Sequence, residues 1–212
     1  MKIAFIGSGQ VGGALADRLE RLGHHVTLAA RDPNSSSVRE TLSRNPRLLV
    51  EAPVAAVGGA DVVFLATPYA ANSQVLPDLR EALRGKVLVD CTNPVGPGLS
   101  HGLKSVQSGS EVVQALVPEV RVVKAFSIYG FENFADPSHP GHSVRPALLY
   151  CGADPAAKAT VGALIDALGF QPVDVGGLEQ ALHLEHLTLL WIRMVRVGKR
   201  SPRLVWAALG DA

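Results

Sequence analysis

The chain has 212 residues, of which 47% are hydrophobic and 18% charged, a composition typical of a globular protein with a packed core rather than of a disordered or fibrous one. This length suits one compact unit and is too short for two full-sized independent domains. The 20 basic and 19 acidic residues leave a formal charge of only +1, which excludes a global field for holding nucleic acid or an anionic membrane surface.

Short apolar runs alternate with amphipathic stretches through the first two-thirds of the chain, a pattern that predicts βαβ units around a buried parallel sheet. We expect strands at residues 2–6, 25–30, 48–51, 62–66, 87–90 and 121–126. Helices are expected at residues 10–21, 35–43 and 72–83, and the Pro- and Gly-rich residues 94–99 should form a loop.

A smaller section is expected to begin near Pro146, after a polar segment at residues 136–142. It should hold strands at 147–151 and 172–175, a helix at 155–168 and a largely helical tail from Leu178 onward. With about 65 residues, this section is small for an independent domain and should dock on the first. The sequence therefore predicts a Rossmann-type, doubly wound, mostly parallel sheet at residues 1–145, with a small C-terminal α/β section at 146–212 in the same compact unit.

The start of the chain and its cysteines indicate a cytoplasmic protein. Met1 leads directly into a strand-like run, without the basic and apolar regions of a signal peptide. The apolar residues 187–195 are interrupted by Arg193 and fall below the roughly 18 to 20 residues needed to span a bilayer. Cys91 and Cys151 have no partner at metal-ligand or redox-motif spacing, so we interpret both as reduced structural thiols.

The sequence Gly-Ser-Gly-Gln-Val-Gly at residues 7–12 matches the G-x-G-x-x-G pattern of dinucleotide-binding turns. It lies between a predicted strand and a predicted helix, with a second strand close behind, which is the context that the pattern requires. Gly7 would permit the tight turn, Gly9 would let the backbone approach a pyrophosphate, and Gly12 would let the helix pack closely on the strand. The helix N-terminus would offer free N–H groups to the phosphates. The alternative is a tight turn without a ligand.

The end of the second strand favours NADP over NAD. An NAD site usually presents Asp or Glu there to the ribose hydroxyls, whereas this chain has Ala30 followed by Arg31. A guanidinium can form charge-assisted hydrogen bonds with a 2′-phosphate, and Asn34 and residues 35–37 add donors close by. The carboxylate of Asp32 argues against a 2′-phosphate at this position, and its alternative role is to cap the following helix.

Three loops follow the fourth, fifth and sixth predicted strands at the carboxyl edge of the sheet, where ligands bind in open α/β folds. They are Ala-Thr-Pro-Tyr at 66–69, Asp-Cys-Thr-Asn-Pro at 90–94 and Lys-Ala-Phe-Ser at 124–127. We expect them to line the nicotinamide side of the cleft, although each could be a simple strand terminator. The ring of Phe126 is expected to shape the face that receives the electron acceptor.

These motifs, with Phe-Gln-Pro-Val-Asp-Val-Gly-Gly-Leu at 170–178 and Leu-Glu-His-Leu-Thr-Leu-Leu-Trp at 184–191, resemble the NADPH-dependent reductases of the deazaflavin coenzyme F420. They are also similar to the cytosolic domain of the six-transmembrane metalloreductases, and the likeness covers nearly the whole chain. The resemblance implies that Ser8, Gly9, Gln10 and Val11 contact the pyrophosphate, that Ala30, Arg31 and Ser35 surround the 2′-phosphate, and that Thr67, Pro68, Asn93, Ala125 and Phe126 lie along the ribose and nicotinamide. Gly7, Gly12 and Pro94 are expected to belong to the cofactor site as well.

The resemblance further implies direct hydride transfer between NADP and a stacked deazaflavin or flavin, which needs proximity and orientation more than an acid or base. We therefore name no catalytic residue. One alternative is a dehydrogenase or imine reductase of a small carbon substrate, which usually needs a proton donor, and Lys124 is the only evident one. Others are a non-enzymatic NADP-binding module or a subunit that passes electrons to a partner.

Several residues near the end of the chain suggest other functions. His183 and His186 could be metal ligands, but no third ligand has suitable spacing, so we expect no metal. The basic residues of the tail are more simply a solvated face than a nucleic-acid site. Trp191 and Trp206 should pack in the core or in a dimer interface. We expect a homodimer that acts on a small redox acceptor and binds neither nucleic acid nor membrane.

Overall fold

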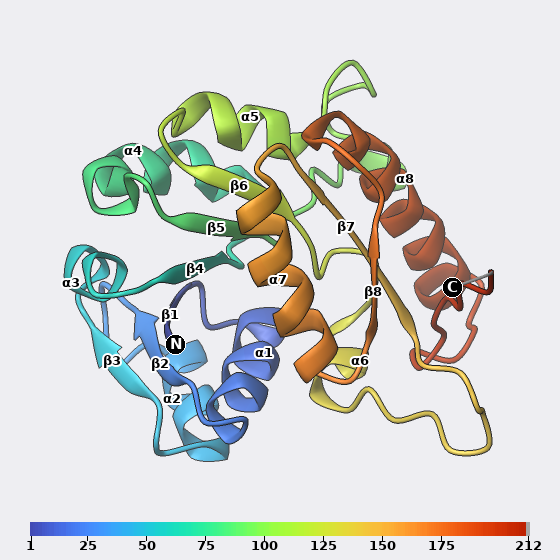
Figure 1. Cartoon of the computed structure of the whole chain (residues 1–212), viewed down its shortest axis with the longest axis horizontal. Coiled ribbons are helices and arrows are strands. Elements are labelled where there is room, and N and C mark those ends of the chain that lie inside the picture. The colour runs from blue at the N-terminus through green and yellow to red at the C-terminus, as the bar shows by residue number, and fades with distance from the viewer. Residues whose placement is uncertain (211–212) are drawn as a thin grey trace.

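The computed structural model describes residues 1–210 and contains one eight-stranded sheet in the order β3-β2-β1-β4-β5-β6-β7-β8 (Figure 1). The strands are β1 (Lys2–Ile6), β2 (His25–Ala29), β3 (Leu49–Glu51), β4 (Val62–Leu65), β5 (Val87–Asp90), β6 (Arg121–Lys124), β7 (Ala147–Gly152) and β8 (Gln171–Asp174). All neighbouring strands are parallel except β6 and β7, which pair antiparallel. This arrangement confirms the predicted Rossmann-type, mostly parallel sheet.

The longer helices cover both faces of the sheet. They are α1 (Gln10–Arg21), α2 (Ser36–Arg44), α3 (Pro53–Gly58), α4 (Asn72–Leu83), α5 (Gly109–Leu116), α6 (Phe131–Ala135), α7 (Pro155–Ala167) and α8 (Ala181–Ile192). Helix α1 packs against α2 and α6, and the guanidinium of its Arg18 donates to the carbonyl of Leu168, just after α7. These four helices therefore lie on one face of the sheet (Figure 1). On the other face α3 contacts α4, α4 contacts α5, and α5 contacts α8.

The predicted strands are all present, and the almost entirely buried strands β1, β4 and β5 read as nearly continuous apolar runs. Strands β1 and β5 have the predicted bounds, the ends of the others differ by one or two residues, and the largest difference is that β6 ends at Lys124 rather than at Phe126. Phe126 has a φ of +54°, a left-handed conformation that cannot continue a strand. Helices α3, α5 and α6 lie where no helix was predicted.

Two predictions about irregular segments need correction. Residues 94–99 are not entirely a loop, because Pro97–Leu99 forms a short 3-10 turn. The tail is helical only as far as Val197, through the 3-10 turn η3 (Leu178–Gln180), α8 and the π-helical turn η4 (Arg193–Val197). Beyond it the chain runs without helix to residue 210, and the carbonyl of Trp206 accepts the N–H of Ala147 at the start of β7.

The order of the strands positions the site. The chain starts at β1 and proceeds outward to β2 and β3, then returns to β4 on the opposite side of β1. The crevice at the carboxyl ends of β1 and β4 is therefore the topological switch point, where open α/β sheets bind ligands. Among residues 1–210, every helix is too short or too polar to cross a membrane.

Candidate functional site

The turn between β1 and α1 has the geometry that its three glycines predict. Gly7 has a φ of +101°, and a Cβ there would lie 2.7 Å from the carbonyl carbon of Ala66. A Cβ on Gly12 would overlap the carbonyl oxygen of Gly7. A Cβ on Gly9, by contrast, would meet no atom within 4 Å. The protein itself requires Gly7 and Gly12, whereas Gly9 leaves open space at the N-terminus of α1.

The N-terminus of α1 is free to bind an anion. Gly9 is the N-cap of the helix, and no side chain caps its first N–H groups. Ser8 is held beside it, since its Oγ lies 3.1 Å from the Oγ of Ser37 and its carbonyl accepts the hydroxyl of Thr41. Both partners belong to α2, so this helix fixes the turn from the side where the second strand ends. The role of Thr41 was not found from the sequence.

A groove runs from this turn across the ends of β1 and β2. It brings together six of the predicted cofactor residues, namely Gly7, Ser8, Ala30, Arg31, Ser35 and Thr67. Seven more residues line it: Ile6, Ala29, Asp32, Ser37, Val38, Pro53 and Val75. Gln10 is exposed at the start of α1, Val11 is partly buried, and Pro68 is exposed before the 3-10 turn η1 (Tyr69–Ala71).

The part of the groove at the end of β2 is suited to a phosphate. Arg31 is exposed, and its guanidinium has no hydrogen bond or ion pair to any residue from 1 to 210. The alternative interpretation, in which Asp32 caps α2, is wrong. Its Oδ1 accepts the N–H of Asn34 at 2.9 Å, and Ser35 is the N-cap residue of α2. The carboxylate of Asp32, next to Arg31 in the chain, thus accepts a local backbone hydrogen bond and forms no ion pair with that guanidinium.

The three loops at the carboxyl edge are joined by side-chain hydrogen bonds. Thr67 donates to Asn72 at 2.9 Å, and Asn72 donates to the hydroxyl of Thr92 at 3.1 Å. Asn93 donates to the carbonyl of Ser127 at 3.3 Å, which links the ends of β5 and β6.

Helix α8 supports two of these loops from the C-terminal section. The hydroxyl of Thr188 lies 3.1 Å from Oδ1 of Asn93 and 3.0 Å from the carbonyl of Ser127.

The loop after β6 differs from expectation. Ala125 and Phe126 are both fully buried, and the ring of Phe126 packs 5.7 Å from that of Phe64 and 5.9 Å from that of Phe134. The expectation that this ring shapes the acceptor face is therefore wrong, because the left-handed turn directs it into the core. Only the backbone of this loop can reach the edge of the sheet. Pro94 is buried as well.

Lys124 is buried rather than exposed in the cleft. Its Nζ donates to the carbonyl of Thr92, lies 3.2 Å from Oε1 of Glu185 and lies 3.6 Å from Oδ2 of Asp90. Burial alone would lower its pKa, but the charges of Asp90 and Glu185 outweigh that effect and raise the pKa above its usual value. The amine is therefore a charged structural partner and is poorly placed to donate a proton to a substrate.

Glu185 and Asp90 accept hydrogen bonds on all sides. Glu185 receives the N–H of Gly109 at 2.9 Å and lies 2.8 Å from Nε2 of His101. Asp90 receives the N–H and hydroxyl of Thr92 at 2.9 and 2.7 Å, and the hydroxyl of Ser110 at 2.6 Å. No role was predicted from the sequence for either acid, although Asp90 begins one of the predicted cleft loops. The only available signal was that Asp90 and Lys124 end two neighbouring strands, where they are register partners.

His183 and His186 lie two residues before and one residue after Glu185 in α8. Both are exposed, and the ring of His186 stacks on that of His101 at 5.4 Å. Within residues 1–210, no three His, Cys, Asp or Glu side chains are grouped as metal ligands would be. Cys91 and Cys151 are free and buried, and burial raises the pKa of Cys151 to about 12.

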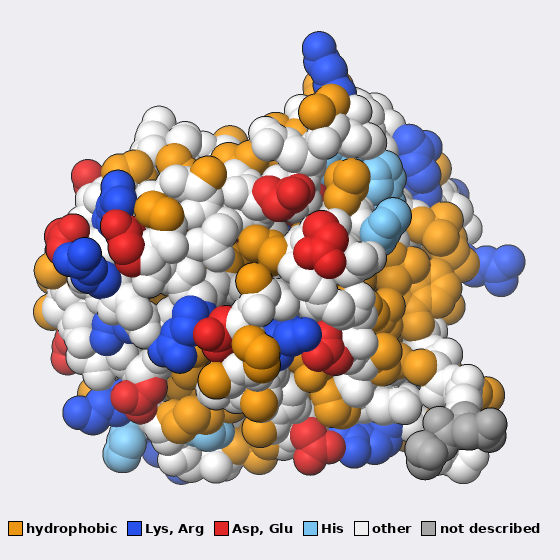
Figure 2. Space-filling model, turned by 45° about the horizontal axis from the view of Figure 1, so that its top comes forward, with side chains coloured by type: hydrophobic (Ala, Val, Ile, Leu, Met, Phe, Trp, Pro, Cys, Tyr) orange, Lys and Arg blue, Asp and Glu red, His pale blue; other side chains and the backbone are white. Residues whose placement is uncertain are grey.

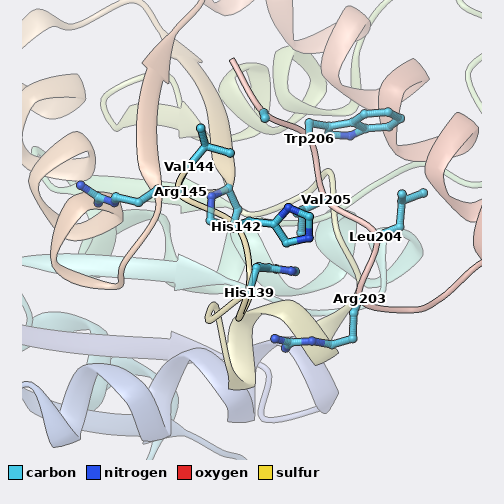
Figure 3. A pocket seen from close by; sticks show the side chains of 10 residues that line it. His139, His142, Val144, Arg145, Arg203, Leu204, Val205 and Trp206 are labelled. Atoms are coloured by element: carbon cyan, nitrogen blue, oxygen red, sulfur yellow. The ribbon is translucent and has the colours of Figure 1, made fainter. Parts of the chain in front are cut away.

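A second hollow lies away from the Gly-rich turn, between residues 139–146 and the tail (Figure 3). Its lining includes His139, His142, Arg145, Arg203 and Trp206, and none of the predicted cofactor residues. Both arginines are engaged by the chain itself, Arg145 with Asp166 at 2.9 Å and Arg203 with Asp136 at 3.3 Å. This hollow therefore lacks the free cation that distinguishes the groove at Arg31.

Comparison with known proteins agrees with this geometry. The model of a family described as "NADP oxidoreductase coenzyme F420-dependent" matches residues 2–94. The metalloreductase STEAP3 of Rattus norvegicus is 33% identical over 189 residues, which cover 89% of this chain and 36% of that protein, so the chain spans about a third of that relative. The F420-dependent NADP reductase of Methanocaldococcus jannaschii is 29% identical over 91% of both chains. The crystal structure of a putative F420-dependent NADP reductase from Arthrobacter has a TM-score of 0.85 and 31% identity, and the match covers 94% of this chain and 95% of that one. On these grounds the chain belongs to the family of coenzyme F420-dependent NADP oxidoreductases.

Proposed function

We propose that this protein is an NADPH-dependent reductase that passes a hydride from NADPH to a deazaflavin or flavin acceptor. The observation that carries the proposal is the open space at Gly9, directly at the uncapped N-terminus of α1. The free N–H groups and the positive end of the helix dipole favour a pyrophosphate at that point.

The choice of NADP rests on Ala30 and Arg31. A carboxylate at position 30 would accept hydrogen bonds from the ribose hydroxyls of NAD and repel a 2′-phosphate, whereas the methyl group of Ala30 does neither. Arg31 is exposed, lines the same groove as the turn, and has no other partner among residues 1–210. A guanidinium held in this way can form two parallel hydrogen bonds with a phosphate.

We propose that the cofactor meets the residues expected from the sequence. These are Gly7, Ser8, Gly9, Gln10, Val11 and Gly12 at the pyrophosphate, Ala30, Arg31 and Ser35 at the 2′-phosphate, and Thr67, Pro68, Asn93, Pro94 and the backbone of Ala125 and Phe126 at the ribose and nicotinamide. The hydrogen bonds that join Thr67, Thr92, Asn93 and Ser127 would keep the nicotinamide end rigid.

When bound, NADPH supplies the hydride, and the protein's contribution is orientation. The charged side chains nearest to the proposed nicotinamide end, Asp90, Lys124 and Glu185, are buried and paired with one another. This arrangement favours direct transfer between stacked rings, with the balancing proton taken up by the acceptor from solvent. It disfavours a dehydrogenase or imine reductase that uses Lys124 as proton donor.

The deazaflavin acceptor is proposed because relatives that match nearly the whole chain are named as F420-dependent reductases. We further propose that the protein acts in the cytoplasm as a homodimer. Figure 2 shows hydrophobic side chains gathered over α8 and the turn that follows it, where Leu190 and Val197 are 48% and 64% exposed. An apolar helix face of this kind is typical of an interface core.

Binding and turnover can be tested in one preparation. Titration with NADPH should enhance the fluorescence of the nicotinamide. Steady-state oxidation of NADPH should then be measured with coenzyme F420, riboflavin, a small imine and a 2-keto acid. We expect turnover with the first or second acceptor. Turnover with the imine or keto acid alone would favour the dehydrogenase alternative, and binding without turnover would favour a non-enzymatic NADP-binding module.

A further inference from the structure

A network of four charged or titratable side chains lies under the loops at the carboxyl edge. Asp90 ends β5, Lys124 ends β6, Glu185 comes from α8, and His101 comes from the segment before α5. Their side chains are between 0% and 2% exposed. Because they are excluded from water, their charges act on their surroundings more strongly than surface charges do.

The hydrogen bonds define the net charge of this network. Nδ1 of His101 accepts the N–H groups of Leu103 and Ser105 at 3.3 and 3.2 Å, so the ring proton is on Nε2 and is donated to Glu185. His101 is therefore neutral. Asp90 and Glu185 have only donors as partners, as ionised carboxylates require, and Lys124 is charged. Two negative charges and one positive charge leave the network at −1.

This charge is close to the loops proposed for the nicotinamide end. Lys124 donates to the carbonyl of Thr92, and Asp90 holds the N–H and hydroxyl of the same residue. Tyr69 lies in the loop after β4, and its pKa is raised first by burial and then by the charges of Glu185 and Asp90. The charges of the network therefore act on this loop too. The network's net charge of −1 therefore lies at the carboxyl ends of β5 and β6, beneath these loops.

We propose that the net negative charge of the Asp90–Lys124–Glu185–His101 network favours the oxidised nicotinamide over the reduced one and so makes bound NADPH a stronger hydride donor. The ring of NADP⁺ carries a positive charge and the ring of NADPH is neutral, so a buried negative charge stabilises only the oxidised form. This inference rests on the proposed binding of NADP. It makes Glu185 a positioning residue that acts through the loops and the field, without touching the cofactor.

The test compares the two oxidation states in binding. Glu185→Gln removes one negative charge and keeps the size of the side chain and an oxygen that can accept from Gly109. We expect the ratio Kd(NADP⁺)/Kd(NADPH) to rise roughly three- to tenfold, and a tenfold rise corresponds to about 30 mV in the potential of the bound couple. Fluorescence titration or calorimetry measures both constants without any acceptor.

Thr188→Val is the matched control on the same helix face. It removes the hydrogen bonds to Asn93 and Ser127 without changing any charge, so both dissociation constants should change by the same factor. Binding of 2′,5′-ADP, which reports only the adenosine end, should be unchanged in both variants and shows that they are folded.

Asp90→Asn provides an independent variant, because it removes the other negative charge and should shift the ratio in the same direction even if Glu185→Gln folds poorly. A ratio equal to that of the unmodified protein in either folded charge variant would overturn the inference, as would an equal shift in Thr188→Val. If the unmodified protein binds neither NADP⁺ nor NADPH, the proposed function fails instead, which is a distinguishable result.

Discussion

At the scale of single residues, Arg31 should decide which cofactor is bound. It is the cation that lines the groove at the end of β2, and no residue from 1 to 210 pairs with it. We expect NADPH to bind at least tenfold more tightly than NADH, and Arg31→Ala to lose most of that preference while the affinity for NADH stays the same. Arg39→Ala, on the exposed face of α2 outside the groove, is the control. Equal affinities for both cofactors in the unmodified protein would contradict the assignment.

A substitution at Gly9 can distinguish a purely structural role of the Gly-rich turn from a role in binding the cofactor. Because a Cβ at this position meets no atom within 4 Å and the φ of −69° is allowed for any residue, Gly9→Val should fold normally. Its side chain would fill the space proposed for the pyrophosphate, so NADPH affinity should fall by at least a hundredfold. Calorimetric titration measures this, and Gly58→Val, at another open glycine, is the control for stability. Undiminished affinity in the folded variant would mean that the turn binds no cofactor.

At the scale of elements, the turn after β6 places the aromatic ring of Phe126 in the core. Phe126→Ala should lower the free energy of unfolding by about 3–5 kcal/mol, because it removes a fully buried ring packed against Phe64 and Phe134. Alanine is also no better suited than Phe to a φ of +54°. Urea denaturation measures the loss. A variant of normal stability that is defective only in acceptor use would instead support a role of the ring at the acceptor face.

The elements differ in how far the sequence predicts them. Strands β4 and β5 could be predicted because both faces are buried and their residues are all apolar before Asp90. Helix α5 was missed although Ser108 and Glu111 form a complete capping box, which is a readable signal. The Gly-rich turn and Arg31 were predictable because local chain geometry determines their roles. The partners of Glu185 were not, since His101 and Lys124 are 84 and 61 residues away and meet it only through packing.

At the scale of the whole molecule, we propose that residues 1–145 and 146–212 fold as one cooperative unit. The sheet continues from β6 through β7 to β8, and α8 is bonded to loops of the first section through Glu185 and Thr188. Both tryptophans lie after residue 146, so their fluorescence reports the second section, whereas far-ultraviolet circular dichroism reports the entire chain. The two transitions in urea should coincide. An earlier fluorescence transition would indicate that the smaller section unfolds independently.

Isotope transfer can show whether the hydride passes directly from NADPH to a deazaflavin-type ring. NADPH carrying deuterium at C4, prepared separately on each face of the ring, is mixed with the protein and oxidised coenzyme F420 in a single turnover. We predict that deuterium from one of the two faces is found on carbon in the reduced deazaflavin and that the transfer shows a primary isotope effect. Reduced acceptor without deuterium from either face would rule out direct transfer, and NADPH that remains unoxidised with every flavin and deazaflavin offered would rule out the proposed reductase activity.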